Sequence, residues 1–368
     1  MPLKLGHYYL VTNPETPVPE ISGLILDTNF VGNFYEWFLS TNPDPEVTKD
    51  LLPILQLIRE KRLVHWQYGA LEKSWAWQDV KEVNPHNYSR INPHLFRRIG
   101  HAIETILFAS NQDFSSWTTS NRNFSLPFSK EARSHPVSEP LSKEEAKEYF
   151  QIVAPAWIAC LLLMDFQTRI TSDMSIEALT KLFLEWRGAV RSTGAPETSE
   201  VVLIGELFFF GGTISGQYYE NNYLGKSNSF PVFDSTKLLK VDAWKTLGKA
   251  KIARNIAFDL ALLNLQHLNR FGLRPGEASI LRVRPEKMAI VTGDKGIAVI
   301  AQQFGPAIEI PNLLPARVHI HPVNSRYRLE RPIEDLPLLY QLPHRPPQDL
   351  PRQDQLGKPL EDLIQRSK

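Results

Sequence analysis

The sequence has very little cysteine: Cys160 is the single one among 368 residues. This count excludes a disulfide framework within the chain and a cysteine-rich zinc site. The neighbours of Cys160 in the run 154–166 (APAWIACLLLMDF) are apolar. We therefore expect a buried, unreactive thiol.

An excess of charge of one sign is also absent. Lysine and arginine total 41, aspartate and glutamate total 40, and the formal net charge is +1. No overall field attracts a polyanion, so any binding of nucleic acid has to come from a local basic patch. The histidines show no metal-ligand spacing with cysteines or acids, and the glycines form no phosphate-binding G-x-x-x-x-G-K-[ST] loop.

Long hydrophobic runs are missing as well. The two most apolar stretches are residues 154–166 and 201–212, and the second contains Glu206. Both are shorter than the roughly 20 residues that cross a bilayer. The first residues, MPLKLGHYYLVTNPETP, lack the apolar segment of a secretory signal. The sequence therefore predicts a cytoplasmic protein with no membrane partner.

The residues that are present indicate a globular α/β protein, with 42% hydrophobic and 10% aromatic residues. Strands and helices alternate in the first part of the chain, which is typical of a layered α/β fold. The expected elements there are a buried strand at 23–28, helices at 33–40 and 45–62, a strand at 62–66 and a helix from 69–77.

The rest of the chain is less regular. One helix is expected at 99–109 within the irregular stretch 80–145, and further helices over 142–190. Residues 201–210 are expected in the core, as either a strand or a helix. The remaining expected elements are a long helix at 238–270, a strand at 288–292 and a short helix at 297–304. Residues 311–368 are rich in proline and predict a peripheral strap and tail rather than a core element.

Three carboxylates occupy positions where an exposed charge is not expected. Asp27 and Asp294 each end an apolar strand, and Asp259 lies within the apolar stripe of the long helix. A buried carboxylate needs a cation, a metal or hydrogen-bond donors. Ligands of open α/β sheets gather at the carboxyl ends of the strands, where these acids would converge. Hard oxygen ligands suit Mg²⁺ or Mn²⁺.

Four short motifs, in this order, resemble those of PIN-domain nucleases. They are LILDTN at 24–29, YGALEKSW at 68–75, ARNIAFDLALL at 253–263 and IVTGDKGIA at 290–298. The second motif adds Glu72 to the acids. The resemblance covers roughly residues 20–80 and 240–310. The gap between the second and third motifs is much longer than in compact members of the family, so Glu104 and Glu206 remain alternatives to Glu72.

The resemblance implies a three-layer PIN-like α/β fold with a central parallel sheet, a mainly helical insertion and a proline-rich C-terminal tail. Its two halves would be residues 1–80 and 238–310, with the insertion at 81–237 and the tail at 311–368.

It also implies metal-dependent hydrolysis of phosphodiester bonds, most readily in RNA, with Mg²⁺ or Mn²⁺ as cofactor. We expect Asp27 and Asp294 to bind the metal, Asp259 to bind or anchor it, and Glu72 to bind it or orient the water. Residues expected to orient the acids or to contact substrate phosphate are Asn29, Thr292, Lys295, Lys251 and Arg254.

Each of these acids also suits a purely structural role. Asp27 and Asp294 are well placed to cap the helices that follow them. Asp259 is able to form a buried ion pair with Arg254 or Lys251, and Glu72 to complement a helix dipole. The basic residues of the long helix are equally compatible with a solvated face.

Two other functions compete with the nuclease hypothesis. One is a catalytically silent PIN-like scaffold that binds nucleic acid or protein, and the other is a metal-dependent phosphatase. The sequence leaves open RNA against DNA, cleavage specificity, the role of the insertion, a homo-oligomer, and an inhibitory protein partner such as those of toxins or defence effectors.

Overall fold

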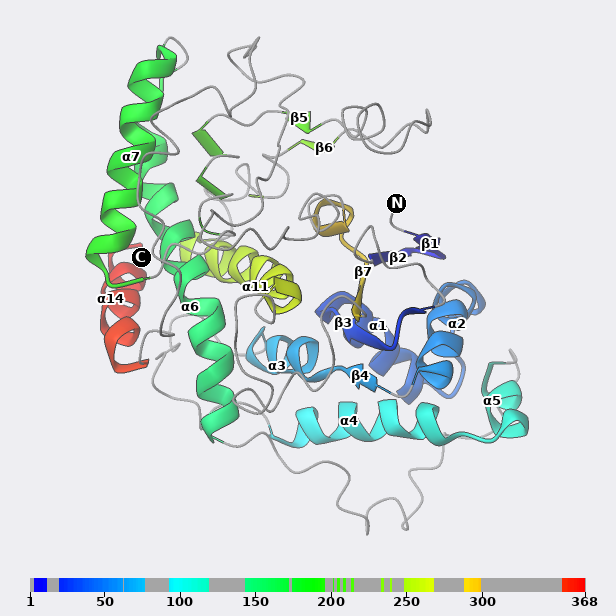
Figure 1. Ribbon diagram of the computed structural model, residues 1–368. Helices are drawn as coiled ribbons and strands as arrows, with labels where there is room; N and C mark the ends of the chain where they lie inside the picture. Colours follow the sequence, from blue (N-terminus) through cyan, green and yellow to red (C-terminus); the bar gives the residue numbers. More distant parts are fainter. Residues whose placement is uncertain are drawn as a thin grey trace. The chain divides into compact units, whose positions relative to one another are not determined.

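The computed structural model describes the following residues: 3–11, 20–61, 63–76, 93–118, 143–171, 174–195, 248–267, 288–298 and 353–367, with the short pieces 201, 204–205, 208–209, 213–214, 233–234 and 239. The chain forms two compact units (Figure 1). The first comprises Met1–Val83, Asn87–Ala146 and Gly272–Ala298, and the second Asn84–His86, Lys147–Phe271 and Val299–Lys368.

Five described strands of the first unit form a mixed sheet in the order β1-β2-β7-β3-β4. β3 pairs in parallel with both β4 and β7, whereas β2 is antiparallel to β7 and β1 is antiparallel to β2. An α/β fold is thus confirmed. The expected central parallel sheet is present in part, because β4, β3 and β7 are parallel whereas β2 and β1 are antiparallel. The strands are β1 (Leu3–Leu5), β2 (Tyr8–Val11), β3 (Gly23–Leu26), β4 (Leu63–His65) and β7 (Met288–Thr292).

The antiparallel strands β1 and β2 form a hairpin that was not expected from the sequence. Gly6 turns the chain between them with φ at 62°, a left-handed conformation that glycine adopts without a steric penalty. Tyr9 then pairs with Thr292 and Leu10 with Val291 of β7. The hairpin therefore extends the sheet beyond β7, next to the turn that carries Asp294.

The burial of the central strands β3 and β7 explains why their sequences are almost continuously apolar. Every residue of both strands is buried. A strand that is buried on both faces has no need for alternating polar residues, and parallel sheets commonly show this pattern. The expected strands at 23–28, 62–66 and 288–292 are confirmed to within two residues at each end.

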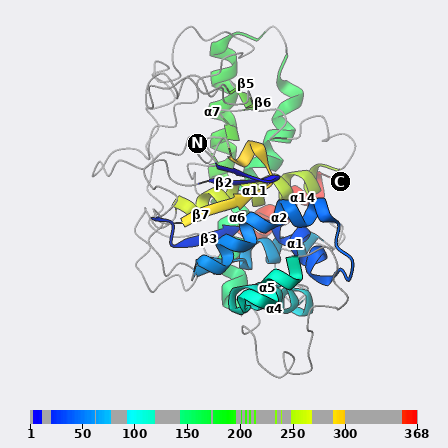
Figure 2. The same ribbon diagram turned by 90° about the vertical axis from the view of Figure 1, so that its right-hand side faces the viewer.

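Helices pack around this sheet in the first unit. Helix α1 starts directly after Asp27, five residues earlier than expected, and α5 was not expected at all. In Figure 2, α1 and α2 lie between two groups of elements: strands β7 and β3 on one side, and helices α4 and α5 on the other. The helices are α1 (Thr28–Leu39), α2 (Pro45–Glu60), α3 (Gln67–Ala76), α4 (Pro93–Phe108) and α5 (Asn111–Thr118).

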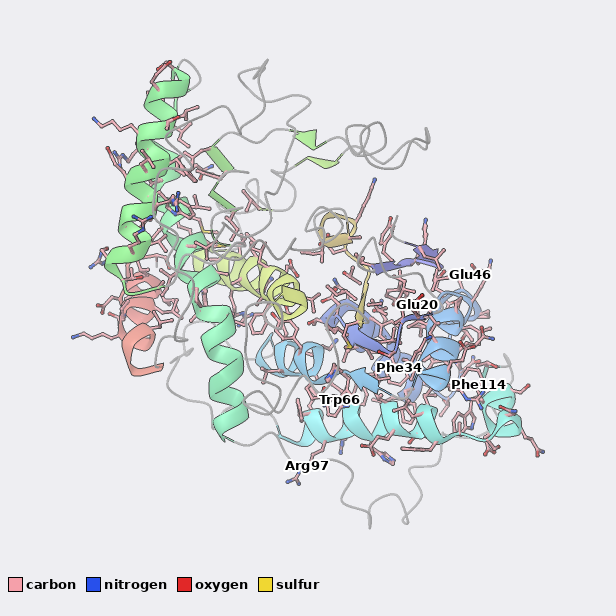
Figure 3. All side chains as sticks on the ribbon, in the orientation of Figure 1. Glu20, Phe34, Glu46, Trp66, Arg97 and Phe114 are labelled. Carbon is pink, nitrogen blue, oxygen red and sulfur yellow. The ribbon has the colours of Figure 1, made fainter. Side chains whose placement is uncertain are left out.

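Aromatic side chains fill the core of this unit. Phe30 and Phe34 lie one turn apart on α1 with stacked rings, and Tyr8 meets Phe30 edge to face at 5.1 Å. Trp66 packs against Phe96 of α4, with ring centroids 4.7 Å apart. Figure 3 shows Phe34 and Trp66 inside this packing. Because one side of α1 packs into this core, its apolar residues recur at helical spacing in the sequence.

The second unit is mainly helical among the described residues. Cys160 is buried on α6, as expected, and burial raises the pKa of its thiol well above the ordinary range, as does the charge of Asp259. The pieces of 201–210 that the structure describes are helical at 201, 204–205 and 208–209, and Val201, Ile204 and Phe209 are buried. The elements are α6 (Lys143–Phe166), η4 (Gln167–Arg169), α7 (Ile176–Ser192), β5 (Thr213–Ile214), β6 (Phe233–Asp234), α11 (Lys249–His267) and α14 (Gln353–Arg366).

Two expectations about this unit are wrong. The helix α11 begins at Lys249, and Gly248 before it has φ at 83°, which is not helical, so one continuous helix from 238 is wrong. Residues 238 and 240–247 lie outside the described part of the chain. The C-terminal tail contains α14, whose Leu356, Leu360 and Ile364 are buried. These residues recur at helical spacing, so this part of the tail is a core element rather than a strap.

The domain limits expected at 80, 237 and 310 stay predictions, and the compact units divide the chain at other positions. Helices α4 and α5 belong to the unit of the sheet, where α4 contacts α1, α2 and α3. Helix α11 belongs to the other unit. Among the described residues, no helix combines the length and apolar character that crossing a membrane requires.

Candidate metal centre

Asp27 is held at the carboxyl end of β3 by three side-chain contacts. Its Oδ1 accepts a hydrogen bond from the backbone N–H of Thr28 at 2.7 Å, and its Oδ2 accepts one from the hydroxyl of Thr292 at 2.7 Å. A longer contact of 3.4 Å joins Nδ2 of Asn29 to the same Oδ2. The side chain caps α1, so the capping role is real, but only 2% of Asp27 is exposed.

This environment raises the pKa of Asp27 from 3.8 to about 6. Burial is the largest cause, because it disfavours the charged carboxylate. The hydrogen bonds from Thr292, Thr28 and Asn29 lower the pKa, whereas the nearby charge of Asp294 raises it. The two aspartates therefore repel each other when both are charged, and a cation between them would relieve this repulsion.

Asp294 follows β7 and caps the helical turn that starts at Lys295. Its Oδ1 accepts hydrogen bonds from the N–H groups of Gly296 at 2.6 Å and Ile297 at 3.1 Å. Within the described residues its Oδ2 takes part in no hydrogen bond. Lys295 is exposed beside it. Capping thus uses one carboxylate oxygen and leaves the other for a ligand.

Thr292 links the two aspartates. Its hydroxyl donates to Oδ2 of Asp27 and accepts from the backbone N–H of Asp294 at 2.9 Å. Thr292 is fully buried, so this orientation is shielded from water. The role expected for Thr292, which is to orient the acids, stays a prediction that these contacts allow.

Glu72 approaches this site from α3. Its Oε2 accepts a hydrogen bond from the hydroxyl of Thr28, the residue that follows Asp27. Gly69, one turn earlier in α3, lies against the end of β3: a Cβ atom there would be 2.7 Å from the carbonyl oxygen of Leu26. The close approach of the helix to the strand end is what brings Glu72 within reach of Thr28.

The sheet order explains why these residues meet. From β3 the chain continues to β4 on one side, whereas β7 lies on the other side. Such a switch point in a parallel sheet is where ligands of open α/β folds bind, outside the carboxyl ends of the strands. Asp27 and Asp294 follow these two strand ends, and Figure 1 shows β3 and β7 next to each other.

The β1–β2 hairpin borders the same site through Tyr8. A Cβ atom at Gly293 would lie 3.7 Å from the ring of Tyr8 and 3.6 Å from Cβ of Asn29. Burial raises the pKa of Tyr8, and the charges of Asp50 and Asp27 raise it further. Its hydroxyl accepts a hydrogen bond from Nδ2 of Asn33 at 2.9 Å.

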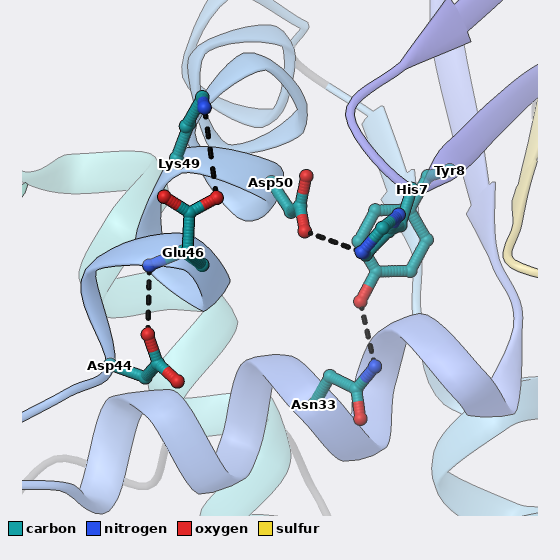
Figure 4. A network of polar contacts seen from close by, with 7 residues as sticks. All are labelled: His7, Tyr8, Asn33, Asp44, Glu46, Lys49 and Asp50. Atoms are coloured by element: carbon teal, nitrogen blue, oxygen red, sulfur yellow. Dashed lines mark hydrogen bonds and ion pairs between the residues drawn. The ribbon is translucent and has the colours of Figure 1, made fainter.

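Polar contacts attach the hairpin to the helices (Figure 4). His7 lies 3.1 Å from Asp50 of α2, and the contact between Tyr8 and Asn33 reaches α1. Asn33 and Tyr8 were not identified from the sequence as part of the site. Residues 8–11 (YYLV) are too short a run to predict the hairpin that places Tyr8 there.

The third expected aspartate belongs to the other unit. Asp259 on α11 is buried with 8% of its surface exposed, and Arg254 is buried as well, whereas Lys251 is exposed. Their proposed roles at the metal and the substrate stay predictions.

Of the alternatives to Glu72, Glu104 lies half-buried on α4, where burial raises its pKa. Glu206 lies outside the described residues.

The carboxylate oxygens at this site are of the type that binds a divalent cation, but there are few of them. Within the described part of the chain, no group of three or more histidine, cysteine or acidic side chains is arranged to hold a metal. Mg²⁺ commonly keeps several waters and binds proteins through one or two carboxylates. Asp27 and Asp294 suit that mode, since the cap formed by Asp294 uses Oδ1 and not Oδ2.

Comparisons with known proteins do not assign the chain to a family. No family model matches it, and no curated protein or solved structure shows significant similarity to it.

Proposed function

We propose that this protein is a metal-dependent endonuclease that hydrolyses phosphodiester bonds through a carboxylate-bound Mg²⁺ or Mn²⁺ ion. The observation that carries the proposal is the paired arrangement of Asp27 and Asp294 at the ends of adjacent parallel strands. One of these acids is buried with a raised pKa, and such groups cluster at functional sites. The motifs that resemble PIN-domain nucleases support the same reaction class.

The side chains of the site have distinct roles in this proposal. Asp27 and Asp294 would bind the cation, and Thr292 links the carboxylate of Asp27 to the backbone N–H of Asp294 through its two hydrogen bonds. Asn29 supports Oδ2 of Asp27. A bound cation would lower the pKa of a water ligand and neutralise charge on the phosphate. Glu72, which accepts a hydrogen bond from Thr28, would orient that water.

RNA is the substrate that the resemblance favours. Lys295 is exposed immediately after Asp294, where an ammonium group is suited to contact a substrate phosphate. The roles that the resemblance implies for Asp259, Lys251 and Arg254 stay predictions. Location in the cytoplasm and the identity of any protein partner stay predictions.

Cleavage of labelled single-stranded RNA and DNA tests the proposal. Purified protein is incubated with each strand in the presence of Mn²⁺, Mg²⁺ or EDTA, alongside the variant Asp27→Asn, Asp294→Asn. We expect cutting that requires the metal and is lost in the variant, and the preferred strand names the substrate. Wild-type protein that cuts neither strand with either metal refutes the proposal.

A second candidate is a catalytically silent scaffold that binds nucleic acid or protein. It is favoured by the absence of a group of three metal-binding side chains among the described residues and by the engagement of Glu72 with Thr28. It predicts strand binding that is unchanged by EDTA and by the aspartate substitutions. Binding that depends on Mn²⁺ contradicts it.

A further inference from the structure

Three residues of α1, each one turn after the previous one, contact α3. The hydroxyl of Thr28 donates to Glu72, Gly32 lies against the amine of Lys73, and Glu36 accepts from that amine at 3.3 Å. Residues spaced by four lie on one side of a helix. These contacts define a seam between α1 and α3, the two helices that follow the parallel strands β3 and β4.

Two glycines make this seam unusually close. A Cβ atom at Gly69 would lie 2.7 Å from the carbonyl oxygen of Leu26 and 2.9 Å from the backbone nitrogen of Thr28. A Cβ atom at Gly32 would lie 2.8 Å from Nζ of Lys73. Glycine inside a helix is unfavourable relative to alanine, so both positions call for a packing reason. The close approach of strand end, helix and lysine supplies it.

Lys73 is enclosed in this seam although it is charged. Its side chain is 19% exposed, whereas its ion-pair partner Glu36 is 72% exposed. Most of the lysine is therefore fixed by packing against α1, and the exposed carboxylate of Glu36 holds its end. Lys73 is the next residue after Glu72, so whatever fixes Lys73 also fixes the rotation of α3 at Glu72.

We propose that Lys73 is a positioning residue that holds Glu72 against Thr28, beside Asp27. The inference rests on the proposed function, in which Glu72 orients the water of a bound cation. Gly69 sets the distance of α3 from the strand end, and Lys73 sets its rotation through Gly32 and Glu36.

The test compares Lys73→Met with wild type by crystal structures and by Mn²⁺ binding, measured from the electron paramagnetic resonance signal of free Mn²⁺. We expect Glu72 to leave Thr28 and Mn²⁺ to bind about 10-fold more weakly, a typical effect of removing a residue that orients a metal site. The matched control is Lys49→Met. Lys49 forms an exposed ion pair with Glu46 in the same unit, 75% and 79% exposed, and its loss should leave Mn²⁺ affinity unchanged.

Two further variants separate positioning from general stability. Gly32→Ala pushes against the lysine amine from the opposite helix, so we expect it to weaken Mn²⁺ binding in the same direction as Lys73→Met. In a Glu72→Gln background, Lys73→Met should cause no further loss of affinity, because both act through one carboxylate. Independent, additive losses overturn the proposal.

The two proposals fail in distinguishable ways. Wild-type protein that binds no Mn²⁺ contradicts the proposed function, and the crystal structures then decide the positioning role alone. A Glu72 side chain that still contacts Thr28 in Lys73→Met overturns the positioning role, whether or not the metal binds.

Discussion

Substituting Asp27 by asparagine should stabilise the protein above pH 6, although it removes a proposed metal ligand. Asp27 is almost fully buried and its pKa is raised from 3.8 to about 6, mainly by burial. Its charged form is therefore less favourable in the folded protein than in the unfolded chain. The difference corresponds to about 3 kcal/mol of stability lost when the group is ionised.

The direction of the pH dependence follows from this raised pKa. Below pH 3.8 the carboxyl is protonated in both the folded and unfolded states and has no effect. As the pH rises through 3.8 to about 6, the unfolded chain loses its proton first, so the folded state loses stability relative to it. Above pH 6 the ionised Asp27 lowers the stability of the folded state by the full amount. Asparagine at this position carries no charge, so the variant does not lose this stability.

Part of the gain is offset by altered hydrogen bonds. With Oδ1 of the amide still accepting from Thr28, its NH₂ group would face the hydroxyl of Thr292 and Nδ2 of Asn29. A hydrogen bond to a charged group contributes about 1.5–3 kcal/mol, so its weakening reduces the benefit. We expect a net stabilisation of about 1 kcal/mol at pH 8 and a net destabilisation at pH 4.

Urea titrations of wild type and Asp27→Asn between pH 4 and 8, in EDTA, measure this difference. The free energy of unfolding of wild type should fall relative to the variant across this range, by about 3 kcal/mol. Asp362→Asn on the exposed side of α14 is the control: it keeps Asp27, so its free energy of unfolding should follow the pH dependence of wild type. A difference between wild type and Asp27→Asn that stays constant from pH 4 to 8 refutes the reasoning.

Adding Mn²⁺ at pH 8 should stabilise wild type and not the variant, since a ligand stabilises the state that binds it.

Other perturbations probe separate contacts. Thr292→Val removes the hydroxyl that links the two aspartates and should destabilise the fold by about 1–3 kcal/mol in urea titrations; an unchanged stability contradicts the buried link. Gly69→Ala places a Cβ against the backbone of β3 and should destabilise by about 1–3 kcal/mol. Gly188→Ala is its control, because a Cβ there meets nothing within 4 Å, and should stabilise α7 by about 0.5–1 kcal/mol; equal effects of the two alanines argue against the close approach. Leu360→Ala should destabilise the protein by about 2–5 kcal/mol if α14 is a core element, and a change below 0.5 kcal/mol would return it to the role of a surface tail.

Local sequence patterns identified most of the elements that carry the site. A buried strand ending in aspartate is visible in GLILDT and again in MAIVTGD, since a continuous apolar run that stops at an acid is typical of a strand buried on both faces. The helices α2, α3 and α4 were recognisable from apolar residues at helical spacing. Thr292 and Asn29 were found because they adjoin the acids in sequence. These features depend on neighbouring residues, which the sequence presents directly.

The tertiary structure decided what depends on residues distant in the chain. Thr292 meets Asp27 across 265 positions, and Lys73 meets Glu36 across 37, so neither contact has a local signature. The hairpin of β1 and β2 gains its stability from pairing with β7, and α14 from burying Leu356, Leu360 and Ile364, not from strong local preferences. The sequence by itself thus determined which acids stand at the strand ends, whereas long-range packing buried Asp27, which raises its pKa, and brought Glu72 to Thr28.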